Sequence, residues 1–395
     1  MDGLEYGVID EAGVDEVAAI MRWSFGGGED FAPRYVRETV GVDSVRVLRD
    51  GARAVAALAL VPMGMWLGGR RLPLAAVAAV ATAPEARGRG VSQALLAASL
   101  RELRAGGTAL ASLYPASLVL YRRNGFEIAG MNARHRARAS AIDARDRALP
   151  VRPIGPEDMP AVMALHQELA RGQDGNLDRG EAGWRPILRR RGVAATGLGV
   201  FDGGALVGYC WLRQAPASGH APYDLEVADL AATTDAAWRR LLTLLRDHGS
   251  LGAEVRWGGP LADPVTLLLR EEVHQVEEIR RWMLRLVDVG AALAGRGYFR
   301  GVTASVVIEV EDPVLPENAG RYRLEVAGGE AEVTRDDAGS GPVVRCPVGS
   351  LAAIFTGYAK ASELARVGKV GGDPGAIALL DAIFHGPIPW HPDNY

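Results

Sequence analysis

Apolar runs, turns and helically spaced apolar positions follow one another in the first third of the chain. Leu74 to Thr82 is almost continuously apolar, which in its context predicts a buried strand, although its alanine content alone would also suit a helix. A turn follows that begins at Pro84 and contains Arg87-Gly88-Arg89-Gly90. The apolar positions beyond the turn have helical spacing, at Val91, Leu95, Leu96, Leu100 and Leu103. The pattern predicts a strand, a glycine-containing turn and an amphipathic helix.

The middle of the chain repeats this order of elements without the glycines. Residues 225–230 read as a strand, and residues 231–236 form a turn that has no Arg-Gly-x-Gly sequence. A helix face follows at Trp238, Leu241, Leu242 and Leu245. Before it, two strand-like runs flank Asp202-Gly203-Gly204, which is typical of a hairpin. We therefore expect a duplicated unit that has lost whatever site the glycine turn forms in the first copy.

The last hundred residues follow a different order, with strands first and helices afterwards. Strand-like runs cover residues 304–311, 322–326 and 331–335, with a turn at Gly328-Gly329. Helical segments are expected over residues 348–358, 361–370 and 376–384. This arrangement predicts a third unit of mixed strands and helices.

Composition narrows the class of protein. The chain has 395 residues, of which 48% are hydrophobic, and no apolar run approaches the length of a membrane span. The N-terminus lacks the basic and apolar regions of a signal peptide, so we expect a cytoplasmic protein without a membrane partner. The net charge of −4 argues against a nucleic-acid partner. The two cysteines, Cys210 and Cys346, are far apart and indicate neither a metal site nor a disulfide framework.

The glycine turn has the composition of a pyrophosphate-binding site. A helix start carries unpaired N–H groups and partial positive charge, and glycines let a phosphate approach the backbone closely. A P-loop is excluded because lysine occurs only at positions 360 and 369. A dinucleotide fingerprint does not fit, since Gln93 stands where its third glycine belongs. The local motif alone leaves open an ordinary arginine–glycine surface turn.

A second motif follows about 30 residues later. Residues 109–128 read as a strand, a short helix, an Asn-Gly turn and a further strand. The spacing Arg87-x-x-Gly90-x-Ser92 resembles the acyl-CoA signature of the GNAT acetyltransferases, Gln/Arg-x-x-Gly-x-Gly/Ala, with Ser92 departing at the last position. Tyr121, Gly125 and Phe126 match the Tyr-x-x-x-Gly-Phe sequence that closes the GNAT domain. Without this family match, Tyr121 would be read as a core aromatic residue.

The order of parts resembles the Eis-type (enhanced intracellular survival) acetyltransferases over essentially the whole chain. The resemblance implies an α/β (α+β) protein with tandem GNAT acyl-CoA N-acyltransferase folds followed by a sterol-carrier-protein-like domain. The expected domains are a catalytic GNAT domain at 1–145, a second GNAT-like domain without the CoA motif at 146–288 and the sterol-carrier-like domain at 289–395. It also implies a homo-oligomer, with a hexamer as the expected state.

The implied reaction is direct transfer of an acetyl group from acetyl-CoA, as co-substrate, to a primary amine. Aminoglycoside-like polyamines are the leading substrate class. Two alternatives stay open, an enzyme that acetylates protein lysines or small polyamines and a non-catalytic protein that binds CoA or an apolar ligand. The intact Arg87–Gly90 turn and Tyr121 speak against the non-catalytic alternative.

The resemblance also implies the site residues. Tyr121 would protonate the departing sulfur, and the C-terminal carboxylate of Tyr395 would act as the base. Glu29 and Asp30, in a loop after a Gly-Gly-Gly run, and Trp390, in the proline-rich tail, are candidates for binding the amine, although a solvated loop and a tail anchor are equally open. The expected CoA-binding residues are Val80, Ala81, Thr82, Arg87, Gly88, Arg89, Gly90, Val91, Ser92, Gln93, Ala116 and Ser117.

Ordinary pKa values constrain both catalytic roles. Proton donation from a free tyrosine, with a pKa near 10, to a thiolate of pKa about 8.5 is uphill by roughly 2 kcal/mol, so the tyrosine must hydrogen-bond the sulfur as charge develops. A carboxylate of pKa about 3.5 is mismatched with an amine near 10 by roughly 9 kcal/mol. Burial of the carboxylate would reduce this gap, and otherwise the carboxylate mainly orients the amine.

Overall fold

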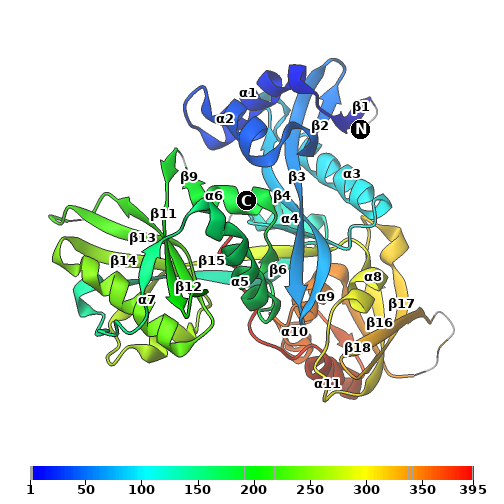
Figure 1. The fold of residues 1–395 in the computed structure, drawn as a ribbon. Helices are drawn as coiled ribbons and strands as arrows, with labels where there is room; N and C mark the ends of the chain where they lie inside the picture. The colour runs from blue at the N-terminus through cyan, green and yellow to red at the C-terminus, as the bar shows by residue number, and fades with distance from the viewer. Residues whose placement is uncertain (1–2, 191, 218, 337–338, 340, 394) are drawn as a thin grey trace. The chain divides into compact units, whose positions relative to one another are not determined.

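A computed structural model describes residues 3–190, 192–217, 219–336, 339, 341–393 and 395 of the chain (Figure 1). Backbone contacts divide the chain into two compact units. The first contains the chain up to Gly130, Arg281–Ile388 and Tyr395, and the second contains Met131–Arg280 and the tail from Pro389. The sterol-carrier-like region therefore shares one unit with most of the N-terminal GNAT region. The chain passes between the units within the strands β6 (Glu127–Arg138) and β15 (His274–Leu286), and again in the C-terminal tail, after Ile388 and before Tyr395.

The N-terminal part of the first unit is a mixed sheet with the order β1-β2-β3-β4-β5-β15. Strands β4 and β5 are parallel, whereas β4 is antiparallel to β3 and β5 to β15. The strand and the helix predicted on either side of the glycine turn are confirmed as β4 and α3. The strands are β1 (Leu4–Val8), β2 (Val45–Asp50), β3 (Arg53–Leu67), β4 (Arg70–Thr82) and β5 (Leu110–Leu113). The helices are α1 (Val14–Phe25), α2 (Phe31–Arg34), α3 (Val91–Ala105) and α4 (Leu118–Arg123).

Helix α3 is held by its apolar face. Leu95, Leu96 and Leu100 are at most 1% exposed, and the helix contacts β3 and β4. Burying a leucine side chain contributes about 2 kcal/mol, so these three residues fix the helix on the sheet. The start of the helix is thereby fixed at the end of β4.

The sterol-carrier-like part of the first unit is a second sheet with the order β18-β17-β16-β19-β20. The predicted strands and helices of this region are confirmed, except that two helices end early. The helix expected over 348–358 ends at Phe355, before Gly357 with its φ of 81°, and the helix expected over 361–370 ends at Arg366, before Gly368 with its φ of 74°. The strands are β16 (Ala304–Glu311), β17 (Gly320–Ala327), β18 (Glu330–Arg335), β19 (Val343–Pro347) and β20 (Gly371–Gly372). The helices are α8 (Val289–Gly295), α9 (Val348–Phe355), α10 (Ala361–Arg366) and α11 (Pro374–Ile383).

The second unit repeats the arrangement of the N-terminal part of the first, with a sheet in the order β6-β14-β13-β12-β11-β7. Strands β13 and β14 are parallel, as β4 and β5 are, and the predicted hairpin is confirmed as β11 and β12. The strands are β7 (Val151–Pro153), β8 (Leu177–Asp178), β9 (Arg189–Arg190), β10 (Val193–Ala194), β11 (Thr196–Asp202), β12 (Ala205–Ala215), β13 (Tyr223–Ala232) and β14 (Gly252–Gly259). The helices are α5 (Met159–Arg171), α6 (Glu181–Leu188) and α7 (Asp235–Asp247).

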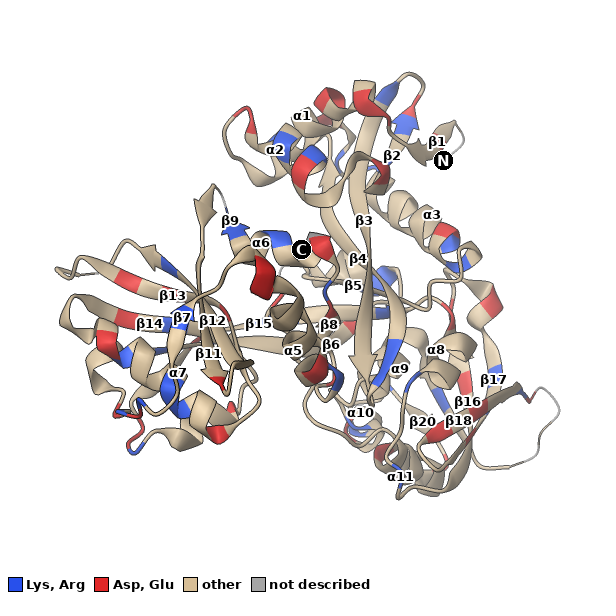
Figure 2. Cartoon of the chain, in the orientation of Figure 1, with Lys and Arg blue, Asp and Glu red and all other residues tan. Residues whose placement is uncertain are grey.

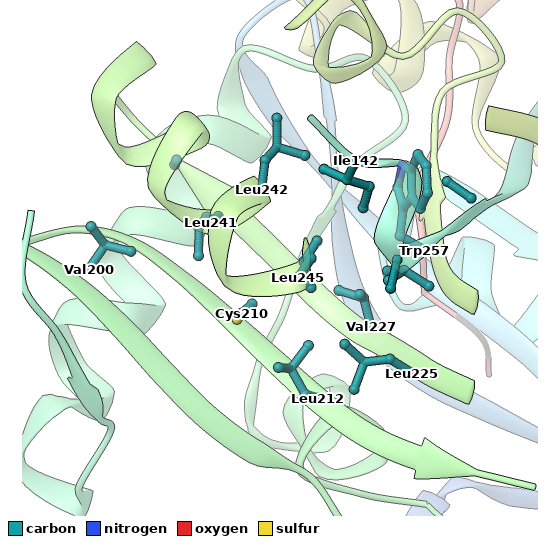
Figure 3. Packing of buried hydrophobic residues seen from close by; sticks show 14 of the residues in the cluster. Ile142, Val200, Cys210, Leu212, Leu225, Val227, Leu241, Leu242, Leu245 and Trp257 are labelled. Atoms are coloured by element: carbon teal, nitrogen blue, oxygen red, sulfur yellow. The ribbon is translucent and has the colours of Figure 1, made fainter. Parts of the chain in front are cut away.

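One core of the second unit lies between α7 and its sheet. Figure 3 shows Leu241 and Leu245 of α7 facing Cys210 and Leu212 of β12, with Trp257 of β14 beside them. All five side chains are buried. Cys210 is thus a small apolar core residue, and burial raises the pKa of its thiol to about 12.

Charged residues of both signs are interspersed along the elements, as on α3 (Figure 2). Over the part of the chain that the structure describes, no helix is long and apolar enough to cross a membrane.

Candidate functional site

The turn between β4 and α3 leaves the start of the helix open. A short 3-10 helix, Pro84–Ala86, follows β4, and the exposed residues 87–90 lead into α3. Gly88 and Gly90 both have a φ of 77°, a left-handed backbone that favours glycine. Gly90 occupies the N-cap position, where no side chain bonds the helix amides, and the first turn of α3 contains no acidic residue. The amides and partial positive charge of this helix start are therefore available to an anion.

The strand before the turn separates from its parallel neighbour. Strands β4 and β5 are paired from Leu74 to Ala76, where the last pair is Ala76 and Ser112. Beyond this point β4 carries an irregularity against β3, and Ala79 adopts a φ of 50°. Its neighbour Val80 is partly exposed although it lies within the sheet. The end of β4 therefore presents backbone groups that β5 does not cover.

Sequence reasoning missed Ala79. It is the only residue besides glycine with a positive φ among the described residues, and such strain is typical of functional sites. Ala79 stands in a run of alanines and valines, so its residue type carries no signal that distinguishes it from its neighbours.

A side-chain hydrogen bond joins the end of the strand to the start of the helix. The hydroxyl oxygens of Thr82 and Ser92 are 2.5 Å apart. A glycine or alanine at position 92, as in the usual signature, could not make this bond. The departure from the signature at Ser92 is thus a local tie between β4 and α3.

The structure brings most of the expected CoA-binding residues together around this turn. Val80, Ala81 and Thr82 end β4, and residues 87–93 run through the turn into α3. Within the turn, Arg89 donates to Asp50 at 2.9 Å. Ala116 and Ser117 lie apart in sequence, exposed in the loop between β5 and α4, where Ser117 is the N-cap residue of α4.

Tyr121 is a buried residue of α4. Its ring packs edge-on against Phe126, with centroids 6.1 Å apart, and its side chain is 5% exposed. Backbone N–H groups of Asn124 and Phe126 donate to the carbonyl of Tyr121 at 2.9 and 3.1 Å. Burial raises the pKa of Tyr121 above its ordinary value, so this hydroxyl keeps its proton at neutral pH.

Tyr395 lies at the end of β5. Its phenol oxygen is 2.7 Å from Oγ of Ser112, and its ring centroid is 5.7 Å from that of Tyr114. Since Ser112 is the last residue of β5 that pairs with β4, the C-terminal residue lies beside the point where these strands separate. Sequence reasoning did not single out Ser112, because a serine within a short apolar strand gives no sign of its partner.

The three residues expected to bind the amine have different surroundings. Glu29 and Asp30 are exposed just before α2, and Oε1 of Glu29 lies 3.8 Å from Nη1 of Arg22. Trp390 belongs to the second unit, where its indole N–H donates to Gln173 at 3.1 Å and its carbonyl accepts from Asn176 at 2.8 Å. These bonds fix the tail, and the assignment of all three residues to the amine stays a prediction.

A buried charge cluster in the second unit holds the same tail. Arg179 donates two hydrogen bonds to Asp229, at 2.6 and 3.1 Å, and a third to Asp393 at 2.6 Å. Tyr209 also donates to Asp229, at 2.8 Å. Burial is the largest single effect and raises the pKa of Asp229, but the charge and hydrogen bonds of Arg179, together with His166 and Tyr209, hold this pKa below its ordinary value. Sequence reasoning missed this cluster because charged residues are expected at the surface.

Within the described ranges, no group of three or more His, Cys, Asp and Glu side chains is placed to hold a metal ion.

Comparison with known proteins covers the three regions separately. The acetyltransferase (GNAT) domain family matches residues 5–129, a second acetyltransferase (GNAT) domain family matches 175–286, and the sterol carrier protein domain family matches 289–392.

Relatives match most of the chain's length. An uncharacterized N-acetyltransferase of Streptomyces coelicolor is 31% identical over 359 residues, covering 83% of this chain and 82% of that protein. The N-acetyltransferase Eis of Mycobacterium tuberculosis is 27% identical over 384 residues, covering 89% of each. The crystal structure of a GCN5-related N-acetyltransferase from Anabaena variabilis matches with a TM-score of 0.94 and 30% identity, covering 99% of this chain and 100% of that one.

Proposed function

The chain belongs to the Eis-type GNAT N-acetyltransferases, and we propose that it acetylates primary amines of aminoglycoside-like polyamines, with acetyl-CoA as the acetyl donor. The observation that carries the proposal is the uncapped start of α3, which follows two glycines with positive φ and adjoins the separated strands β4 and β5. Acetyl-CoA supplies the activated thioester when bound. In this proposal the enzyme works as a cytoplasmic homohexamer.

The proposed cofactor contacts follow from the chemistry of the turn. Backbone N–H groups of Gly88 and of Gly90 to Gln93 would donate to the pyrophosphate, assisted by the charges of Arg87 and Arg89. Val80 to Thr82 would line the pantetheine arm with small side chains. Ala116 and Ser117, at the start of α4, would complete this binding surface.

Tyr121 is the proposed proton donor. As the amine nitrogen bonds to the acetyl carbon and the carbon–sulfur bond breaks, the Tyr121 hydroxyl gives its proton to the sulfur. Its raised pKa makes a separate donation step unfavourable, so the hydrogen bond must strengthen as sulfur gains charge. General acids of this kind contribute about 10²-fold or more to the rate.

Tyr395 is the proposed base, through the carboxylate of its main chain. This carboxylate would orient the amine and accept its proton, while Glu29, Asp30 and Trp390 would attract a polycation. The proposal is supported by the contact of Tyr395 with Ser112 beside the separated strands.

The test is a thiol-release assay with acetyl-CoA and a panel of amines that includes aminoglycosides, small polyamines and lysine peptides. We expect turnover with aminoglycosides, and turnover confined to lysine peptides would refute this substrate class. Tyr121→Phe should lower kcat about 10²-fold. A single glycine added after Tyr395 keeps the phenol but moves the carboxylate, and unchanged turnover in that variant would remove the carboxylate from the mechanism.

A further inference from the structure

The turn that ends the helix of Tyr121 rests on a buried cation. Gly125 has a φ of 78°, and a Cβ added there would lie 2.9 Å from Cζ and 3.0 Å from Nε of Arg285. The guanidinium group is thus packed directly against this glycine. The residues on either side of it, Asn124 and Phe126, donate their N–H groups to the carbonyl of Tyr121. A displacement of the guanidinium would therefore disturb the backbone that holds Tyr121.

The sterol-carrier-like domain supplies the counter-charge. Arg285, on β15, donates from Nη2 to Oδ2 of Asp312 at 2.5 Å, and both side chains are 0% exposed. The other carboxylate oxygen of Asp312 accepts from the N–H groups of Val314 and Leu315, both at 3.1 Å. Asn318 donates to Oδ2 at 2.9 Å. Hydrogen bonds from within the C-terminal domain therefore orient the carboxylate of Asp312 independently of its contact with Arg285.

The same domain also contacts the turn directly. The Cβ added at Gly125 would lie 2.9 Å from Cγ1 of Val348, the first residue of α9. A Cβ added at Gly349 would lie 3.4 Å from the carbonyl oxygen of Phe126. Gly125 and Phe126 are therefore confined between the side chain of Arg285 and the start of α9.

Burying an ion pair at this position costs free energy of desolvation. Among the described residues, Nε and Nη1 of Arg285 have no hydrogen-bond acceptor. Burial lowers the pKa of Arg285, and Asp312 opposes this effect. Apolar residues of similar volume would often stabilise a core as well or better. The pair therefore calls for a role beyond packing, and its contact with the Tyr121 turn provides one.

We propose that Arg285 and Asp312 are positioning residues for Tyr121, and that the sterol-carrier-like domain supports the proton-donating helix during acetyl transfer. This inference rests on the proposed function, in which Tyr121 protonates the sulfur. The ion pair fixes Gly125, the turn amides fix the carbonyl of Tyr121, and Phe126 fixes its ring. Through Asp312, the C-terminal domain thus supports catalysis at Tyr121 with a residue that does not itself touch the substrate.

The test is a double-mutant cycle between Asp312→Asn and Tyr121→Phe. Asp312→Asn keeps the shape of the side chain and removes its charge, so we expect kcat to fall about tenfold while KM for acetyl-CoA changes less than about twofold. In the Tyr121→Phe background, the same substitution should lower kcat less than about twofold, because residues that act as a unit are not additive. Asp263→Asn is the matched control, a buried carboxylate of the second unit that accepts from Trp257 at 2.9 Å, and it should leave kcat unchanged.

Equal losses of kcat in both backgrounds would overturn the positioning role and leave the proposed function standing. Full activity of Tyr121→Phe alone would refute proton donation by Tyr121 and this proposal with it. If Asp312→Asn does not fold, Arg285→Lys replaces it in the cycle, because lysine keeps the charge but loses the planar group packed on Gly125. The same dependence on Tyr121 is then expected.

Discussion

The two GNAT-like regions differ at the start of the helix that follows their parallel strand. In the first, Gly90 precedes α3 and no side chain caps the helix. In the second, Thr234 precedes α7, its hydroxyl accepts from the N–H of Ala237 at 3.2 Å, and Asp235 adds a negative charge to the first turn. A helix start that is already bonded and neutralised offers little to a phosphate. The same fold therefore supports an anion site in one copy and a closed cap in the other.

The strands before these helices show a matching contrast. Both β4 and β13 have an irregular register near their C-terminal ends, after leaving their parallel partners. Near the irregularity in β4, Ala79 and Val80 are small or apolar and partly exposed. Near that in β13, Asp229 is buried and bonded by Arg179 and Tyr209. In the second GNAT-like region, the charged side chains of Arg179 and Asp229 therefore occupy the position at which, in our proposal, the first region binds its ligand.

The largest effect should come from removing the buried cation of the second GNAT-like region. Arg179→Met leaves Asp229 and Asp393 buried without their cation, and breaking a buried pair in this way costs about 3–5 kcal/mol. We expect a loss of this size in the free energy of unfolding measured with urea. Arg152→Met is the control, since loss of this exposed partner of Asp158 should change the free energy of unfolding much less. Equal losses in the two variants would contradict the view that Arg179 holds the second copy together.

The tail bound to the second unit should make stability depend on pH. His391 is fully buried, and burial lowers its pKa from 6.5 to about 4. Below pH 6.5, His391 binds a proton in the unfolded chain but not in the folded chain. The free energy of unfolding therefore decreases as the pH falls from 6.5 to about 4. The full loss is about 3 kcal/mol for this group. In His391→Gln, the fall in stability over this range should be shallower by about that amount, and an unchanged pH dependence would contradict this role of His391.

The contrast between the copies shows what a sequence reveals. The strand, turn and helix around Gly90 were predictable, because apolar periodicity and closely spaced glycines report local structure directly. The strand, short helix and Asn-Gly turn over residues 109–128 were predictable for the same reason, whereas the role of Tyr121 follows only from the family resemblance. Arg179 and Asp229 are 50 positions apart, and Arg285 and Asp312 are 27 apart, so nothing local marks them as partners. Their burial depends on tertiary packing. The residue type alone predicts that charged side chains are exposed, which is wrong for these four residues.

Closing the open copy should abolish its anion site. Gly90→Thr introduces at the start of α3 the residue type that caps α7. A β-branched residue is strained at the φ of 77° found there, and its side chain would lie at the helix start. We expect the affinity for CoA to fall at least about hundredfold, or about 2.8 kcal/mol. Titration calorimetry of the parent chain should give one CoA per chain, because the second copy is capped.

Gly107→Thr is the matched control for this change. Gly107 also has a positive φ, 73°, but it lies exposed beyond the other end of α3 with nothing within 4 Å of an added Cβ. It should lose stability as Gly90→Thr does and keep its affinity for CoA. Equal loss of affinity in both variants would show that strain alone, rather than the position at the helix start, explains the result.

The smallest effect should come from removing the cap of the second copy. Thr234→Ala deletes the hydroxyl that accepts from Ala237, and loss of an N-cap residue costs about 1 kcal/mol. Thr233→Ala, whose exposed hydroxyl donates to the carbonyl of Val207 at 3.2 Å, should cost less than half as much. Neither change should create a second CoA site, because Asp235 still opposes an anion and no glycine allows close approach. A second equivalent of bound CoA in Thr234→Ala would mean that the cap alone separates the two copies, and that the glycines are not required.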